Sequence, residues 1–388
     1  MKVEKLLDVV QIKNPKPEKF SGEKRYYSTG NIDEHNVSEN FELVKFENRP
    51  SRANVQPIEN SVGFAKMKST AKTLLVTKNY SECIFSTGMN FLLPSEHIIS
   101  KYLYYYLISP YFLDLKDKYS GQGIMGGLSN KDLNLFEISV PSLQEQEKIV
   151  DKLDKVFNNI NAILRNNDLK KKLYSDYFES IAWEEVIENQ KFAKNPISDF
   201  FELDPSKSEI LNENLDEVSF IPMADVDELV FEVESKQIKN YKQVKKGYKY
   251  FANGDFLLAK ITPCFENGKM GQVNNLKNKI GFGSTEFIVH RSKGKILNEW
   301  IFLLYSNSRI RKKLASTMSG AVGHKRISKE TISNLQICSP TIQEQKKIID
   351  KLFMIKKIVD KKISIIDKEI VKYSSLKKSI LNKEFSYE

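Results

Sequence analysis

Two long segments of the chain carry apolar residues at three- and four-residue spacing, which is the period of one face of an α-helix. In the first segment these residues are Ile149, Leu153, Val156, Ile160 and Leu164. In the second they are Ile348, Leu352, Ile355, Val359 and Ile363, followed by Ile366, Ile370, Leu376 and Ile380. Because neither glycine nor proline follows Pro340, we predict a C-terminal helix of more than about 40 residues.

The start of each helix is also marked. Pro141 and Pro340 end apolar, strand-like stretches, Ser142 or Thr341 follows, and a glutamate stands three positions later. A hydroxyl residue with glutamate at this spacing is typical of a capping box. A polar helix of this length buries its apolar stripe only against a partner, so we predict that the two helices form a coiled coil.

The chain also repeats itself. The block Pro-Ser-Leu-Gln-Glu-Gln-Glu-Lys-Ile-Val-Asp-Lys-Leu at 141–153 returns at 340–352, 199 residues later, with nine identical positions. The match extends upstream without a gap, pairing Gly121 with Gly320 and Ser129 with Ser328. A repeat of this kind predicts two copies of one unit joined head to tail.

Two globular stretches lie beside the predicted helices, each long enough for its own core. We predict domains at 1–141 and 190–340, and helical segments at 142–189 and 341–388. Both domains are predicted to be α+β, with strands near 73–77, 220–223, 230–233 and 287–289 and short helices near 102–107 and 300–305. Similarity between them is faint, at 27–33 against 221–227 and at 86–87 against 284–285, so their surfaces have diverged.

Composition adds a bias towards a polyanionic partner. Sixty Lys and Arg against fifty Asp and Glu give a net charge of +10 and an isoelectric point near 9.1. Residues 341–388 hold twelve lysines against seven acids, so about half of the excess lies on the last helix. The remainder is spread thinly over the rest of the chain.

Cysteine usage and hydropathy indicate a cytoplasmic protein. Cys83, Cys264 and Cys338 are far apart, without the spacing of a zinc site or a disulfide framework. No apolar run approaches the roughly 20 residues of a membrane span, and charges at the N-terminus argue against a signal peptide.

The sequence offers little support for an enzyme. The four histidines, His35, His97, His290 and His324, are scattered, and we expect them at the surface or at the edge of the core. Residues 121–126 spell G-x-G-x-x-G, but no buried strand precedes them, so a dinucleotide loop is not predicted. Neither a phosphate-binding loop nor an amino-methyltransferase motif is present.

Three charged residues in the second domain have two interpretations, a metal site and a solvent-exposed strand. Asp227, Glu234 and Lys236 could form the Mg²⁺-binding triad of a nuclease. Their spacing is cramped, and the alternation at 230–235 favours a half-exposed strand whose acids face water.

Together these features resemble the specificity subunit of a Type I restriction-modification system. The resemblance covers nearly the whole chain: two divergent domains, each followed by a glycine loop, a β segment, Pro-x-x-Gln-Glu-Gln and a long helix. The segments 254–259 (Gly-Asp-Phe-Leu-Leu-Ala) and 284–287 add support. Where the second half has 254–259, the first shows Ala-Lys-Thr-Leu-Leu-Val at 71–76, so the first domain is expected to differ in detail.

The resemblance implies a DNA-binding protein without catalysis. Each domain would recognise one half of a bipartite target in double-stranded DNA, and the helices would pack antiparallel as a spacer in a pseudo-twofold repeat. Two methylation subunits carrying S-adenosylmethionine, and a restriction subunit using ATP and Mg²⁺, would supply the chemistry. This chain would hold no cofactor or metal.

Candidate contacts follow from the chemistry of DNA recognition, in which basic and amide side chains reach base edges while basic and hydroxyl groups hold phosphates. In the first domain we predict DNA contacts at Arg25, Tyr27, Ser28, Asn31, Arg49, Ser51, Arg52, Lys66 and Lys68. In the second we predict Lys245, Lys246, Lys260, Thr262, Lys269, Ser284, Thr285, His324, Lys325 and Arg326.

The repeated polar clusters at the helix starts are predicted to meet the same partner twice. They comprise Gln144, Glu145, Gln146, Gln343, Glu344 and Gln345. Two alternatives remain open: an adaptor coiled-coil protein with two protein-binding domains, and a stand-alone Mg²⁺-dependent nuclease.

Overall fold

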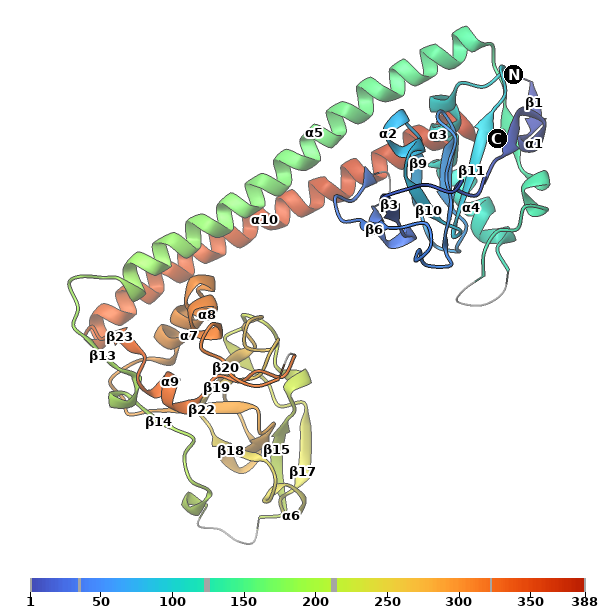
Figure 1. The fold of residues 1–388 in the computed structure, drawn as a ribbon. Coiled ribbons are helices and arrows are strands. Elements are labelled where there is room, and N and C mark those ends of the chain that lie inside the picture. The colour runs from blue at the N-terminus through green and yellow to red at the C-terminus, as the bar shows by residue number, and fades with distance from the viewer. Residues whose placement is uncertain (1, 34–35, 122–125, 211–214, 322, 387–388) are drawn as a thin grey trace. The chain divides into compact units, whose positions relative to one another are not determined.

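The computed structural model describes residues 2–33, 36–121, 126–210, 215–321 and 323–386. The chain divides into two compact units: unit 1 comprises Met1–Asp168 and Asp367–Glu388, and unit 2 comprises Leu169–Ile366. Each unit holds one globular part and a section of each long helix (Figure 1).

The two predicted long helices are present. Helix α5 (Leu143–Ala182) has 40 residues and continues into a π-helical turn at Trp183–Ile187, and helix α10 (Ile342–Phe385) has 44 residues. The predicted capping boxes are confirmed: Ser142 N and Oγ donate to Glu145 Oε2, both at 3.2 Å. Thr341 N and Oγ1 donate to Glu344 Oε2 at 2.9 and 2.7 Å.

Among its described residues, the globular part of unit 1 holds two four-stranded sheets. The order in the first is β6 (Glu42–Val44), β3 (Lys24–Tyr27), β10 (Ile84–Ser86), β7 (Ala53–Val55). The order in the second is β2 (Val10–Ile12), β11 (Met89–Pro94), β8 (Val62–Ala65), β9 (Thr73–Leu75). Two short pairs join β1 (Val3–Lys5) to β12 (Glu137–Ser139) and β4 (Ile32–Asp33) to β5 (Asn36–Val37). The helices are α1 (Leu6–Val9), α2 (Lys78–Ser81), α3 (Ser100–Leu107) and α4 (Pro110–Tyr119).

Unit 2 repeats this plan. One sheet has the order β17 (Gln237–Asn240), β15 (Glu217–Ile221), β21 (Ile280–Gly283), β18 (Lys249–Ala252). The other has the order β14 (Phe201–Leu203), β22 (Phe287–Ser292), β19 (Phe256–Ala259), β20 (Met270–Val273), β16 (Glu232–Val233). A short pair joins β13 (Lys194–Pro196) to β23 (Gln336–Cys338). The helices are α6 (Tyr241–Val244), α7 (Asn298–Ser306), α8 (Ser308–Ala315) and α9 (Lys329–Ser333).

The duplication predicted from the sequence extends to strand order. In both units the same neighbours run parallel, β3 beside β10 and β15 beside β21, while β16 is an addition in unit 2. Each of β3 and β15 is followed within two residues by a 3-10 turn, at Thr29–Asn31 and Met223–Asp225. The faint matches at 27–33 and 221–227 therefore mark equivalent places in one repeated α+β fold.

One predicted equivalence is wrong. The counterpart of β19, which carries most of the segment 254–259, is β8 rather than 71–76, because each lies between the equivalent strands of its sheet. Asn60 and Gly254 precede these strands with φ of 65° and 86°. Their N–H groups donate to Val76 O at 2.9 Å and Val273 O at 2.8 Å. Asparagine is one of the few residues besides glycine that adopts this left-handed conformation readily. The two units therefore share the same backbone conformation at this position although the residue type differs.

In each unit a buried aromatic side chain of a short helix bonds to the strand that precedes a long helix. In unit 1 the hydroxyl of Tyr102 donates to Ser139 O at 3.0 Å, and its ring lies 5.2 Å from that of Phe385. In unit 2 Trp300 Nε1 donates to Cys338 O at 3.1 Å. The predicted short helices at 102–107 and 300–305 are thus confirmed as buried parts of α3 and α7.

The long helices pair antiparallel within each unit (Figure 1). In unit 1 Lys152 pairs with Glu384, and Asn167 Nδ2 donates to Glu369 Oε2 at 3.2 Å, so 15 residues forward on α5 match 15 residues back on α10. In unit 2 Lys351 pairs with Glu185 at 2.6 Å. The predicted coiled coil is therefore confirmed within each unit. Among the described residues, no helix is both long enough and apolar enough to cross a bilayer.

His290 makes the stability of unit 2 sensitive to acid. It is fully buried and its Nε2 lies 3.1 Å from the Tyr305 hydroxyl, and burial lowers its pKa from 6.5 to about 4. The unfolded chain therefore takes up a proton that the folded chain excludes as the pH falls from 6.5 towards 4. We expect this group alone to remove about 3 kcal/mol of unfolding free energy over that range. Urea unfolding of wild type and His290→Leu at several pH values tests this, and curves of identical pH dependence would contradict it.

Candidate nucleic-acid interface

In unit 1 a lysine follows directly on the end of β8 and is held by its backbone. Lys66 N donates to Gly88 O at 3.0 Å, and Lys66 O accepts from Leu128 N at 2.9 Å. Two residues on, Lys68 N donates to Gly126 O at 3.0 Å. Three segments therefore meet at this strand end: the strand itself, the turn after β10, and the chain that leads to the long helix.

The same bonds occur in unit 2 at the end of β19. Lys260 N donates to Glu286 O at 2.8 Å, and Lys260 O accepts from Ile327 N at 2.9 Å. Thr262 N donates to Lys325 O at 2.9 Å. The structure thus brings together several of the predicted DNA-contacting residues of each half at one repeated place, which we call the strand-end site.

A Ser-Thr turn forms one side of each strand-end site. Ser86 Oγ and Ser284 Oγ each accept a hydrogen bond from the N–H two positions further on, at 3.1 and 3.2 Å, which fixes the turns. The next residues, Thr87 and Thr285, are exposed. In unit 1 Thr87 N also donates to Arg52 O at 2.9 Å, so Arg52 belongs to the site.

The strand-end site of unit 2 carries one internal ion pair and a basic cavity. Arg326 Nε and Nη2 bind the carboxylate of Glu286 at 2.7 to 3.1 Å, and this contact holds the pKa of Glu286 below its usual value. Beside it Lys260 lines a cavity of about 490 Å³ together with Lys207 and Lys249. An arrangement of amines and hydroxyls around a hollow suits an anionic ligand.

Other predicted residues of unit 1 serve the local fold. Tyr27 is buried with its ring stacked on Phe85. Arg25 donates to Asn79 Oδ1 at 2.5 Å, and Arg49 donates from Nε to Ala53 O at 3.1 Å. Ser28 and Asn31 bond to each other at the 3-10 turn. Of the remaining predicted residues, Ser51, Arg52 and Lys68 are exposed and Lys66 is half-buried.

In unit 2 the contacts of Lys269 are internal. Its Nζ donates to Met223 O and Val226 O at 3.3 and 2.8 Å, and the equivalent Lys72, which the sequence did not single out, donates to Thr29 O at 2.8 Å. Sequence reasoning also missed Lys207 and Lys249, because nothing in their spacing marks them. His324 and Lys325 are exposed, and so are Lys245 and Lys246, which follow α6.

Two members of the predicted partner surface need correction. Gln146 and Gln345 are fully buried, so neither side chain faces a partner in this conformation. Gln146 Oε1 accepts from Ile99 N at 2.9 Å, and Nε2 donates to His97 O and Pro141 O at 2.7 and 3.0 Å. These bonds fasten the start of α5 to the segment that precedes α3. Exposed members of the clusters are Gln144, Glu145, Gln343 and Glu344.

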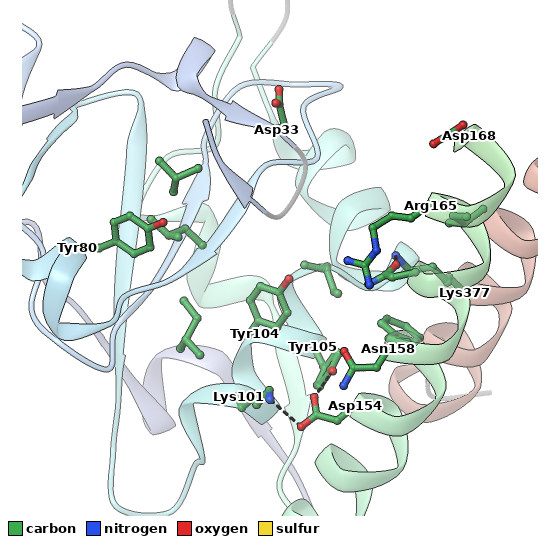
Figure 2. A pocket seen from close by; sticks show the side chains of 17 residues that line it. Asp33, Tyr80, Lys101, Tyr104, Tyr105, Asp154, Asn158, Arg165, Asp168 and Lys377 are labelled. Carbon is green, nitrogen blue, oxygen red and sulfur yellow. Dashed lines mark hydrogen bonds and ion pairs between the residues drawn. The ribbon is translucent and has the colours of Figure 1, made fainter. Parts of the chain in front are cut away.

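Unit 1 also contains a hollow, which lies between its globular part and the long helices (Figure 2). It measures about 770 Å³, and Asp154 at its wall pairs with Lys101 at 2.6 Å and accepts from the Tyr105 hydroxyl at 2.5 Å. Burial, and then the charge of Asp154, raise the pKa of Tyr104 beside it to about 12. Both charge signs line the hollow, because Asp33, Asp154 and Asp168 lie there with Lys101, Arg165 and Lys377, and Asp154 is already bonded.

The candidate nuclease residues do not line either hollow. Asp227, Glu234 and Lys236 are exposed, and the described part of the chain contains no cluster of three His, Cys, Asp or Glu side chains that could hold a metal. His97 and His324 are exposed, as predicted, but the prediction is wrong for His290, which is fully buried. His35 and the centre of the G-x-G-x-x-G segment, 122–125, lie outside the described residues.

Sequence comparison relates the chain to known proteins. The model of a family described as "Type I restriction modification DNA specificity domain" matches residues 1–171 and 189–370. The specificity subunits of the Type I restriction enzymes EcoAI and EcoEI from Escherichia coli are 40% and 38% identical over 145 and 134 residues, or 37% and 34% of this chain. The matched regions span 25% and 23% of those two proteins. A putative specificity subunit, MjaX from Methanocaldococcus jannaschii, is 25% identical over 76% of this chain and 70% of its own length.

Solved structures share the fold. A chain from a study of complex assembly and conformational transition of the type I R-M system superposes with a TM-score of 0.76 at 16% identity, covering 98% of this chain and 96% of that one. The HsdS subunit from Thermoanaerobacter tengcongensis superposes with a TM-score of 0.51 at 17% identity, covering 98% and 95%.

Proposed function

Because the chain belongs to the Type I restriction modification DNA specificity family, we propose that it recognises a DNA target for a restriction-modification system. The observation that supports this most directly is the strand-end site, which occurs twice with the same backbone bonds and with basic and hydroxyl side chains. Such groups bind phosphates and base edges.

The duplication supports a bipartite target. Each unit would read one half-site, and the antiparallel helices would act as the spacer between the half-sites. At the turn beside the site, unit 1 has Gly88 and unit 2 has Glu286. Because such side chains differ between the units, the two half-sites would differ in sequence.

The chemistry would come from partner proteins. We propose that two methylation subunits carry S-adenosylmethionine and that a restriction subunit uses ATP and Mg²⁺, while this chain has no catalytic role of its own. The exposed polar residues at the two helix starts, Gln144, Glu145, Gln343 and Glu344, would contact the two methylation subunits in the same way.

Duplex binding tests the proposal. Full-length chain is mixed with a pool of random duplexes, and bound molecules are sequenced after several rounds. We expect two short sequence blocks separated by a fixed gap, and an affinity that falls linearly with the logarithm of salt concentration because bound phosphates release counterions. An adaptor protein would instead select no sequence, and cleavage of the pool with Mg²⁺ alone would indicate a nuclease.

A further inference from the structure

Two pairs of lysines near the strand-end sites occupy matched positions in the two units, and the structure explains one of these pairs. Lys72 O and Lys269 O accept from Ala65 N and Ala259 N at 2.9 and 3.0 Å, so these two lysines occupy the same place in the two units. Both amines bind carbonyl oxygens of the neighbouring 3-10 turn region. Holding that turn accounts for a lysine at this position.

The other pair, Lys66 and Lys260, has no such explanation. Their backbones make the matched bonds of the strand-end site, yet neither amine forms a hydrogen bond or an ion pair within the described part of the chain. Both side chains are half-buried, and burial lowers the pKa of Lys66. A partly desolvated amine without a partner is unfavourable by itself, so its retention in both units points to a ligand.

The surroundings indicate the charge of that ligand. Lys260 lines the cavity with Lys207, Lys249 and Thr285. Of the two acidic groups nearby, Asp204 is paired with Lys249 at 3.0 Å, and Glu286 is paired with Arg326 at 2.7 Å. The amine of Lys260 therefore remains available to an anion.

The residues around the two lysines differ between the units, and this difference indicates whether the lysines bind a DNA base or a phosphate. Residues at matched positions differ, with Gly88 against Glu286 and Lys68 against Thr262, while the lysine stays. A base contact depends on sequence and would diverge with its neighbours, whereas a phosphate is the same in every half-site. A lysine amine also binds as a point charge, which tolerates changes in nearby shape.

Resting on the proposed function, we propose that Lys66 and Lys260 bind backbone phosphates at corresponding positions of the two half-sites. The two lysines thus set the position of each unit on the duplex, and the divergent side chains beside them read the bases.

The test uses full-length chain carrying Lys66→Gln, Lys260→Gln or both, with duplexes selected by the wild-type chain. Each single substitution is expected to reduce the slope of log affinity against log salt by about 0.9, and the double by about twice that. Affinity at fixed salt should fall about tenfold for each, as for the loss of one hydrogen bond to a charged group. Sequences selected by the variants should be unchanged in both half-sites.

Matched controls separate this role from general charge. Lys148 and Lys347 are another duplicated pair, exposed on the long helices, and their change to Gln should leave the slope unaltered. Lys66→Arg and Lys260→Arg should retain the slope, because the charge is kept. Thermal unfolding of every variant establishes that it is folded.

Three results would overturn the proposal: an altered base preference in one half-site, a change of slope for only one of the two lysines, or an equal change for Lys148→Gln and Lys347→Gln. Failure of the wild-type chain to bind any duplex would instead refute the proposed function itself.

Discussion

Replacing Gln345 by leucine should destabilise unit 2 by about 2–5 kcal/mol, because three backbone groups at once lose their hydrogen-bond partner, the fully buried amide of Gln345. Gln345 Oε1 accepts from Leu297 N at 2.8 Å, and Nε2 donates to Lys295 O and Pro340 O at 2.9 and 2.8 Å. Leucine fills the space but offers no donor or acceptor. Each buried group left unsatisfied costs about 1–3 kcal/mol.

The measurement should follow the site itself, because a chain with two units need not unfold in one step. Hydrogen exchange of the Leu297 amide should accelerate strongly in Gln345→Leu, together with a lower denaturant midpoint for unit 2. The exposed Gln343, two residues earlier on α10, supplies the control, and Gln343→Leu should change neither quantity. Equal protection of Leu297 in wild type and Gln345→Leu would refute the structural role of the glutamine.

A matched insertion of seven residues into both long helices should widen the gap between the two half-sites by about three base pairs. Seven residues make nearly two turns and add about 10 Å at 1.5 Å per residue, so the apolar stripe stays on the same face. The DNA rises by about 3.4 Å per base pair. This expectation follows from the proposed role of the helices as a spacer.

The insertion sites are set by the antiparallel register. Asn167, which is 2% exposed, bonds to Glu369, so segments placed after residue 168 and before residue 367 lie opposite one another. Methylated or selected sites are then sequenced. The half-site sequences should stay the same while the gap changes, and an insertion in α5 alone should disrupt packing because it breaks the register. A double insertion that keeps the original gap would rule out the spacer.

Local features of the fold were predictable from the sequence because their causes are local. The apolar period determined α5 and α10, and the hydroxyl residue with glutamate three positions later determined their capping boxes. The strand segment at 287–289 and the helix at 300–305 were found by composition, and they form β22 and α7. These signals act within a few neighbouring residues, where sequence and conformation are directly coupled.

The roles of single side chains were harder to predict, because partners distant in the chain decide them. Gln345 belongs to a strongly polar sequence block, which suggests an exposed side chain. In the structure it is buried and bonds to Lys295 and Leu297, about 50 residues earlier. Nothing in the sequence distinguishes Lys260 from Lys269. In the structure the Lys269 amine binds two carbonyl groups and holds the fold, whereas the Lys260 amine has no partner among the described residues. Asn60 was missed as the counterpart of Gly254 because the shared property is a backbone angle.

Unit 1 is built from two separate stretches of the chain, and this affects the order of folding during translation. Unit 2 is one continuous stretch, Leu169–Ile366, whereas unit 1 also requires Asp367–Glu388. Phe385, fully buried beside Tyr102 and Tyr106, is synthesised only after all of unit 2, a delay on the order of ten seconds or more at 5–20 residues per second. Until then those two tyrosines lack their covering ring on the nascent chain. The globular part that leaves the ribosome first is therefore completed last.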